Sequence, residues 1–511
     1  MIIFPVGPCQ LLGEYPDKRQ PMSGETTLFY GSVVNPLTLT SYASLPRCLL
    51  CVGPTGNIEW VVDDVEPHDL QNVLAQKGQI DAELFELKHG EFLMPGFVDT
   101  HTHAPQVANI GTGQQYELLD WLANVTFPME SRFADVDFAK RMYTKVVRDF
   151  VNNGTTTCCY YASLHLESSK ALADIVHKAG QRGFIGKCNM NHDSPAYYIE
   201  DSVETSISAT KSLIAHIKSL PPSSSAHASQ GTAQPLVQPI LTPRFAISCT
   251  SELLSALGEL ASSDKSSNSA NPNPILIQTH IAENLSEIEY TKQLFPGAPN
   301  YASVYDQHGL LRQGTILAHG VHLNEEEVAL IKQRGAGISH CPTSNFNLRS
   351  GVAPVGHYLD KGVKVGLGTD VSGGFCNSIL IEIRHASIAS KVLQFSSPTP
   401  SGPQPSGFAN KQLSIPTLLY LATLGGASLC LLDSHIGSFA PGKAFDALLV
   451  SPSRRTLGLW GTGEQPKDVD LPTKKAQLDE WLERFLFCGD DRNIERVYVQ
   501  GVLVGGQSTT A

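Results

Sequence analysis

Two histidines separated by one residue are the first feature of this sequence that could do chemistry. His101 and His103 follow the apolar run FLMPGFVD. In an extended backbone, residues two apart project from the same face, so both imidazoles could reach one cation at about 2.0–2.1 Å. Such a pair is also typical of surface or hydrogen-bonded histidines. Alone, it indicates half of a metal site.

Three more side chains of suitable chemistry follow later apolar runs. His280 lies in IQTHIAEN, His319 in ILAHG and Asp370 in GLGTD. Imidazole and carboxylate ligands suit Zn²⁺, which lowers the pKa of a bound water toward neutrality and so provides a nucleophile for electron-poor carbon. The sequence therefore predicts a catalytic divalent metal, with buried structural histidines as the alternative interpretation.

Glu283, three residues after His280, is the candidate proton carrier. A carboxyl group at that place could move a proton from water to a ring nitrogen or to a leaving amine. The alternative is a glutamate that only stabilises the start of a helix.

Eight apolar runs alternate with helix-like sequence and would position these residues, a pattern that predicts an α/β fold with a TIM-like (β/α)8 barrel. Because the carboxyl ends of barrel strands face a common centre, residues far apart in the chain can share one site there. The runs are FLMPGFVD, GTTTCCYYA, GFIGKCNMN, LVQPILTPRF, ILIQTHIAE, TILAHG, AGISHCPTS and VKVGLGTD.

Short β segments separated by turn residues stand at both ends of the chain. TLFYGSVV, RCLLCVG and NIEWVVDD come first, and FDALLVSP and RNIERVYVQGVLV come last. We expect the two ends to form one small β-sandwich-like domain from residues 1–90 and 436–511, with the barrel over residues 91–435. Three Ser, Pro and Asn-rich stretches, from Pro221, Ser262 and Ser396, predict exposed inserted loops.

The composition favours a small-molecule substrate. The net charge of −12 argues against nucleic-acid binding. The first residues, MIIFPVGPCQLLG, make a poor secretory signal, and no apolar run approaches the roughly 18 residues of a membrane span, so we expect a cytoplasmic protein and no membrane partner. Eleven scattered cysteines predict free thiols, and Cys48 and Cys51, three apart in a strand-like run, should point to opposite faces.

The His-x-His pair, the two later histidines and the final aspartate together resemble the amidohydrolase superfamily. The likeness runs from about Leu93 to Asp446, and SHCPTSNFNL at 339–348 resembles the aminohydrolase branch. Within that branch, five further segments resemble the guanine deaminase family: HTHAPQ with Gln106, LLDWLANVTFPME with Trp121 and Glu130, TPRF with Arg244 and Phe245, HIAEN with Glu283, and GTDVSGG.

This resemblance implies a homodimer in which His101, His103, His280 and Asp370 hold one zinc ion per chain and His319 hydrogen-bonds to the water on the metal. It also implies that Gln106 and Arg244 bind a purine edge. Arginine donors suit the O6 and N7 acceptors of guanine, and the glutamine amide, with a donor and an acceptor, suits a mixed edge.

Two aromatic residues complete the predicted substrate site. Phe245 could stack on the purine plane, and Trp121 belongs to the same resemblance. The alternatives are core aromatics for Phe245 and Trp121, a surface ion pair for Arg244 and a helix-start residue for Gln106.

The expected reaction is the hydrolytic deamination of guanine to xanthine and ammonia. Asp370 would accept the proton of the water, and Glu283 would deliver protons to the ring and the amine. An aminohydrolase acting on a pterin, a triazine or an oxidised guanine is the nearer alternative. A non-catalytic scaffold is the more distant alternative, although such a protein would be expected to have lost ligands.

Overall fold

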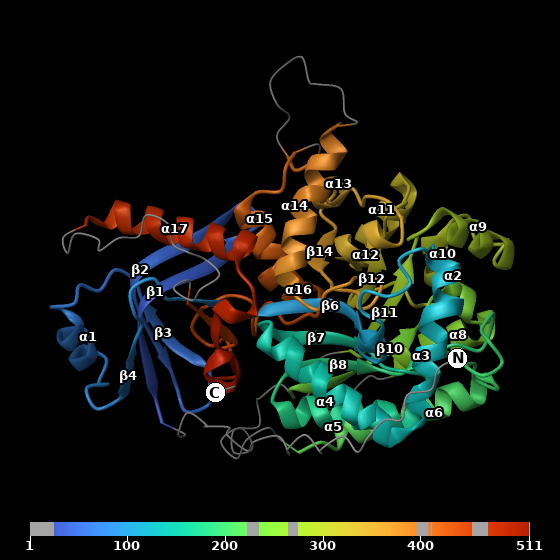
Figure 1. Cartoon of the computed structure of the whole chain (residues 1–511), viewed down its shortest axis with the longest axis horizontal. Coiled ribbons are helices and arrows are strands. Elements are labelled where there is room, and N and C mark those ends of the chain that lie inside the picture. The colour runs from blue at the N-terminus through green and yellow to red at the C-terminus, as the bar shows by residue number, and fades with distance from the viewer. Residues whose placement is uncertain are drawn as a thin grey trace, which may run out of the picture.

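The computed structural model describes residues 25–221, 235–263, 274–395, 407–409, 411–451 and 469–509. These residues form a barrel-like sheet surrounded by helices and a second, separate sheet beside it (Figure 1). The three loops expected from Pro221, Ser262 and Ser396 lie largely outside the described residues.

The predicted barrel is confirmed. Eight strands run parallel in chain order, each pairing with the next, and the short β9 pairs with β10. Their bounds are β6 (Phe97–His103), β7 (Thr155–Tyr161), β8 (Arg182–Gly186), β9 (Cys188–Asn189), β10 (Val237–Pro243), β11 (Leu276–Ile281), β12 (Thr315–His319), β13 (Gly337–His340) and β14 (Lys364–Leu367).

Helices follow the strands and cover the outside of the barrel (Figure 1). Local sequence sets their ends: in α11, for example, Asn324 caps the first turn and Gly335, at φ 72°, ends the helix. The bounds are α2 (Leu118–Trp121), α3 (Phe127–Glu130), α4 (Val136–Asn152), α5 (Leu166–Ala179), α6 (Val203–Lys218), α8 (Ser251–Ser263), α9 (Leu285–Leu294), α10 (Tyr301–Gln307), α11 (Glu325–Arg334), α12 (Pro342–Asn347), α13 (Val355–Asp360), α14 (Ile379–Phe395), α15 (Ile415–Tyr420) and α16 (Gly426–Leu429).

The last barrel strand meets the first through backbone hydrogen bonds at the carboxyl end. The Asp370 N–H donates to the His101 carbonyl at 2.8 Å, and the His103 N–H donates to the Val371 carbonyl at 3.2 Å. Two of the predicted site segments are therefore fastened together directly by their main chains.

The second sheet contains strands from both ends of the chain, as expected. Its order is β17-β16-β15-β5-β1-β2-β3, with β4 paired to β1. Figure 1 shows the N-terminal strands beside the C-terminal helix α17 (Leu471–Cys488). The bounds are β1 (Thr27–Thr38), β2 (Ser41–Val52), β3 (Ile58–Val62), β4 (Glu83–Glu86), β5 (Phe92–Pro95), β15 (Ala447–Val450), β16 (Ile494–Val499) and β17 (Val502–Gly505), with α1 (Leu70–Gln76) between β3 and β4.

The run FLMPGFVD is two strands, although one barrel strand was expected. Phe92–Pro95 pairs with β1 and β15 in the second sheet, and the barrel strand begins at Phe97. The chain passes between the sheets at Gly96, where a Cβ would lie 2.2 Å from the Thr156 side chain. The sequence signal was ambiguous because the apolar residues continue without a polar break from β5 into the first two residues of β6.

Both sides of the second sheet are packed, which explains why the two cysteines of the C-x-x-C pair are both buried although they face opposite sides. Cys48 belongs to a core cluster with Phe29, whereas Cys51 belongs to a different one with Leu28. The two thiols therefore face opposite sides of β2, and both are free. Among the described residues, none of the helices has the length and apolar character needed to cross a membrane.

A buried ion pair joins the barrel to the C-terminal segment. Arg182, at the start of β8, donates through Nε and Nη2 to the Asp446 carboxylate at 3.0 and 3.1 Å. The same carboxylate accepts the Gln500 N–H at 2.8 Å. Both charged side chains are 2% exposed, so each depends on the other for its neutralisation.

Candidate active site

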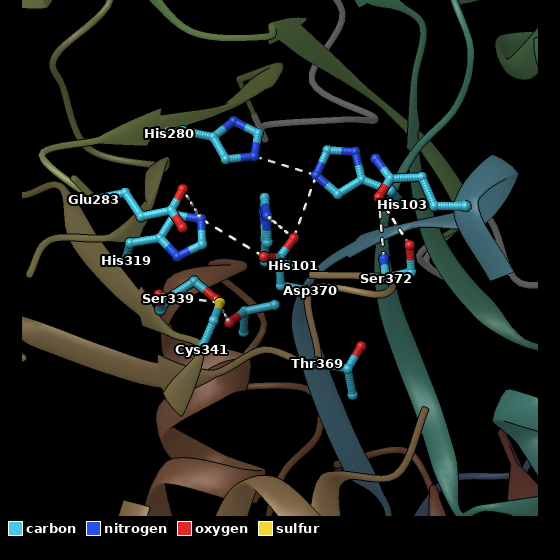
Figure 2. A network of polar contacts seen from close by, with 12 residues as sticks. His101, His103, His280, Glu283, His319, Ser339, Cys341, Thr369, Asp370 and Ser372 are labelled. Carbon is cyan, nitrogen blue, oxygen red and sulfur yellow. Dashed lines mark hydrogen bonds and ion pairs between the residues drawn. The ribbon is translucent and has the colours of Figure 1, made fainter. Parts of the chain in front are cut away.

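Five predicted side chains converge at the carboxyl end of the barrel (Figure 2). His101 and His103 come from β6, His280 from β11, His319 from the end of β12, and Asp370 from just after β14. His101 Nε2 lies 3.0 Å from Asp370 Oδ1, and His103 Nε2 lies 3.1 Å from His280 Nε2. Residues up to 269 positions apart thus meet in one buried cluster.

The potential ligand atoms form a compact group. Those of His101, His280, His319 and Asp370 all lie within 4.8 Å of one another. His103, which is outside that group, still places Nε2 3.4 Å from Asp370 Oδ1. The chain therefore supplies more ligand atoms than a tetrahedral site needs.

Unusual backbone conformations aim two of these side chains. His319 has φ 74° and Asp370 has φ 43°, in the left-handed region that residues other than glycine rarely adopt. Such strain persists only where the surroundings enforce it and is concentrated at functional sites.

The protonation states suit a divalent metal ion. Burial lowers the pKa of His101, and lowers the pKa of His103 and His280 further, so these imidazoles are neutral and keep a lone pair. Burial alone would raise the pKa of Asp370, but the neighbouring imidazoles, His101 first among them, hold it well below its usual range. Buried ring nitrogens without a hydrogen-bond partner, such as His319 Nε2, also fit a site for a cation.

Hydrogen bonds fix how two of the imidazoles are presented. His280 donates through Nδ1 to the Arg244 carbonyl at 2.6 Å, and His319 donates through Nδ1 to Asn345 Oδ1 at 2.9 Å. In each ring the Nε2 lone pair therefore points into the cluster.

Glu283 lies against the cluster. Its Oε2 lies 3.4 Å from His319 Nε2, and its Oε1 accepts the Ser350 hydroxyl at 2.9 Å. Burial raises the pKa of Glu283 to about 7, so this carboxyl can both hold and release a proton near neutral pH. The alternative role expected for Glu283, stabilising the start of a helix, belongs to Glu287. At the start of α9, Glu287 accepts the Glu283 and Asn284 N–H groups.

A pocket opens beside the cluster. Three of the four predicted metal ligands share its wall with Glu283 and the predicted substrate residues, which places the candidate proton carrier and the purine-binding candidates in one cavity. It is lined by His103, Gln106, Leu118, Trp121, Leu122, Arg244, Phe245, His280, Glu283, Glu287, His319, Leu348 and Asp370.

The four predicted substrate residues are all buried in the wall of this pocket. Arg244, 2% exposed, pairs with Glu130 inside the protein, which excludes the surface ion pair. Gln106 lies in a 3-10 helix directly after β6. Phe245 and Trp121 belong to a hydrophobic core cluster and also line the pocket, so their packing and binding interpretations are compatible.

Some residues of the site were missed by sequence reasoning. Asp99 accepts the His101 and Thr369 N–H groups, each at 3.1 Å, and so holds the first and last strand ends together; burial raises its pKa to about 7. Tyr161 packs its ring 4.7 Å from that of His101. Asp99 shares the alternation of the histidine pair and could have been found by it, whereas nothing local marks Asn345 or Ser350.

The chain matches the amidohydrolase family over residues 92–504 and belongs to that family. It is 43% identical to the probable guanine deaminase of Schizosaccharomyces pombe over 88% of this chain and 78% of the relative. It is 40% identical to the guanine deaminase of Dictyostelium discoideum, over 93% of this chain and 97% of the relative.

A solved structure agrees with these sequences. The guanine deaminase from C. acetobutylicum with bound guanine in the active site superimposes with a TM-score of 0.78 at 34% identity, over 94% of this chain and 100% of that one. Within the amidohydrolases, the chain is thus a member of the guanine deaminase family and a hydrolytic enzyme.

Proposed function

We propose that this protein is a zinc-dependent enzyme that converts guanine and water to xanthine and ammonia. The observation that carries this proposal is the shared pocket: buried Arg244 and Gln106 stand in the same cavity as Glu283 and the His and Asp cluster. Relatives named guanine deaminase over nearly the full chain support the choice of substrate.

His101, His103, His280 and Asp370 would hold one zinc ion per chain. When bound, zinc supplies Lewis acidity that makes water a nucleophile at neutral pH. We assign His319 to the attacking oxygen, because Asn345 anchors its Nδ1 and its Nε2 faces Glu283.

The chain's own carboxyl groups move the protons. In the hydrolysis, a C–O bond forms at C2 of guanine and the bond from C2 to the exocyclic nitrogen breaks. Water supplies both protons that are transferred. Glu283 takes up one of them and delivers it to the ring nitrogen; Asp370 accepts the other, which passes through Glu283 to the departing amine, and the amine leaves as ammonia. A pKa of about 7 lets Glu283 carry a proton in either direction near neutrality.

The apolar wall and the buried donors orient the base. Phe245 would stack on the purine plane, Trp121 would close the pocket, and Arg244 and Gln106 would bind the purine edge. This arrangement excludes bulk water and holds C2 near the proton carriers.

An ultraviolet assay of guanine conversion, with and without a chelator, tests the proposal. We expect xanthine and ammonia in equal amounts and loss of turnover when the metal is removed. Adenine, cytosine and a pterin serve as comparison substrates. Equal or faster ammonia release from one of them would reject guanine as the substrate.

Replacing Glu283 by Gln separates proton transfer from metal binding. The amide keeps the size of the side chain but cannot carry the proton, so we expect turnover to fall by about 10²–10⁴-fold while zinc content is unchanged. Glu327→Gln is a matched control, because Glu327 is also buried but caps α11. Loss of zinc from the Glu283 variant would contradict a pure proton-carrier role.

We further propose that the protein acts as a cytoplasmic homodimer, on the strength of the family resemblance. Light scattering during gel filtration should give twice the chain mass of 55.2 kDa. Cell fractionation should recover the activity in the cytosolic fraction. A monomeric mass would refute the homodimer, and a membrane-bound activity would refute the cytoplasmic location.

A further inference from the structure

Glu130 is buried beside the pocket but has no part in the reaction derived above. It ends α3 and its side chain is 1% exposed. Sequence reasoning singled it out only as a point of resemblance. A buried carboxylate is costly unless it is neutralised and hydrogen-bonded, so the partners of Glu130 show what it does.

The Glu130 carboxylate is fully occupied by donors. Oε1 accepts Gln106 Nε2 at 2.7 Å and Arg244 Nη2 at 3.1 Å, while Oε2 accepts Arg244 Nη1 at 2.7 Å and the Tyr198 hydroxyl at 2.7 Å. An ionised carboxylate offers about four acceptor positions, and here each has a partner. Both predicted purine-binding side chains are thus fastened to one anion.

The first consequence is that the Gln106 amide has one orientation. Its nitrogen must face Glu130, and its oxygen accepts the Ser372 N–H at 3.1 Å and contacts the Ser372 hydroxyl at 3.5 Å. Turning the amide would set its oxygen against the carboxylate and its NH₂ against a backbone N–H. Only the second N–H of Gln106 is left to bind a ligand. The residue type alone had predicted a donor and an acceptor.

The second consequence concerns Arg244. The paired contacts with Glu130 fix the plane of the guanidinium, and the Phe127 ring covers it at 5.3 Å. The guanidinium has five N–H groups and no acceptor, so the groups that Glu130 does not use can only donate. Arg244 and Gln106 both line the pocket.

We propose that Glu130 is a positioning residue that makes this corner of the pocket present hydrogen-bond donors only. Such a corner takes a carbonyl oxygen and a neighbouring ring-nitrogen acceptor, the O6 and N7 edge of a 6-oxopurine. It opposes the exocyclic NH₂ of a 6-aminopurine with further donors. This inference rests on the proposed function and assigns to Glu130 the rejection of 6-aminopurines at that site.

The discrimination should be large because the corner is buried. A 6-aminopurine keeps the N7 acceptor but places an NH₂ group where O6 would lie, so a donor that faces position 6 is left without a partner. An unsatisfied buried polar group costs more than a hydrogen bond contributes. Sites that hydrogen-bond a substrate group reject analogues lacking that group by up to about 10⁴–10⁵-fold.

Guanine and 2,6-diaminopurine form the sharpest test, because both carry the 2-amino leaving group and they differ at position 6. The wild-type enzyme should prefer guanine in kcat/KM by at least 10²-fold. In Glu130→Gln, the new side chain has one acceptor oxygen in place of two, and its NH₂ group must face a donor of Arg244 or of Gln106. The fixed arrangement is therefore lost, and Gln106 can turn its oxygen toward the pocket. We expect the guanine to 2,6-diaminopurine ratio to fall at least tenfold while zinc content is kept.

Glu200→Gln is the matched control. Glu200 is likewise buried and accepts three hydrogen bonds, from Lys187 Nζ, the Met190 N–H and the Ser206 hydroxyl, but it touches neither Gln106 nor Arg244. This variant should lose stability while its substrate ratio remains that of the wild type. A Glu130→Gln enzyme with an unchanged ratio, slowed equally on both substrates, would show a merely structural role and overturn the proposal.

Calorimetry on the wild-type holoenzyme keeps the proposal falsifiable if Glu130→Gln does not fold. Hypoxanthine, with a 6-oxo group, should bind at least tenfold more tightly than adenine, with a 6-amino group. Equal or tighter adenine binding would refute the donor-only corner. Failure of the wild type to deaminate guanine would instead refute the proposed function, and the two outcomes are therefore distinguishable.

Discussion

Residue chemistry at the centre of the site depends on which histidines would bind the proposed metal ion. Both His103 and His319 lie within reach of Asp370, at 3.4 and 3.8 Å. Only His319 has a second contact with the proton carrier Glu283. The two imidazoles should therefore differ in role even though they stand in one cluster.

Asparagine substitutions separate the two roles. His103→Asn should reduce the bound zinc well below one per chain and abolish turnover together with it. His319→Asn should keep zinc at one per chain and lower kcat by about 10²–10⁴-fold, as expected for lost acid–base assistance. Metal analysis by mass spectrometry alongside ammonia release measures both. The reverse pattern, with zinc lost from the His319 variant only, would reassign the ligands.

Sequence reasoning found the site residues that follow barrel strands directly, because the fold itself brings strand ends together. It named Glu130 only as part of a resemblance and assigned it no role, because that role arises from its contacts with Gln106 and Arg244. It also could not foresee that Ser372 fixes the Gln106 amide, since a residue type gives hydrogen-bonding capacity but not which part is already used.

At the scale of elements, each barrel strand carries one face toward the centre and one toward the helices. In β13, Ser339 lies 2.6 Å from Thr100 of β6, whereas the next residue, His340, lines a cavity against α13 and α14. His340 is 1% exposed, and neither ring nitrogen has a hydrogen-bond partner. This histidine is therefore a neutral core residue and not part of the active site.

The buried position of His340 predicts a loss of stability in acid. Burial first, and His319 second, lowers its pKa from 6.5 to about 3. Below pH 6.5 the unfolded chain binds a proton that the folded chain refuses, so stability falls as the pH drops from 6.5 toward 3. Between pH 7 and pH 4.5, the free energy of unfolding should fall by about 2–3 kcal/mol less in His340→Leu than in the wild type.

Urea denaturation at pH 7.0, 5.5 and 4.5 measures this effect. Substitution of His177, which lies on the exposed side of α5 and bonds to the Pro221 carbonyl, provides a surface control. An acid dependence in His340→Leu as steep as that of the wild type would show that His340 is not the responsible group.

Element order and strand positions could be predicted because runs of buried β residues recur before helix-like sequence. Two elements could not. The apolar run at 92–99 serves two sheets, and its composition does not show where it changes partner. Helix α17 lies within residues 436–511, which were expected to belong to the β domain, and no helix was predicted there.

The whole molecule depends on contacts between the barrel and the sheet built from both chain ends. The pairing of the two ends was expected because both contain short β segments separated by turn residues. The buried ion pair of Arg182 and Asp446 was not expected, because these residues are 264 positions apart. A buried ion pair contributes little net stability when intact, yet breaking it leaves an uncompensated charge.

Asp446→Asn should therefore destabilise the protein by about 3–5 kcal/mol. Zinc content and turnover at 25 °C per folded molecule should be unchanged, since the pair lies outside the pocket. Asp306→Asn removes a similar pair with Arg334 on the surface and should destabilise the protein much less, because solvent screens exposed charges. Thermal unfolding compares the two variants, and equal shifts in Tm would contradict the importance of burial.

Zinc titration of the metal-free enzyme, followed by guanine turnover, tests the account most directly. Ammonia release should rise in proportion to added zinc and stop rising at one equivalent per chain. Full activity without zinc, or no guanine turnover at any zinc concentration, would contradict the account.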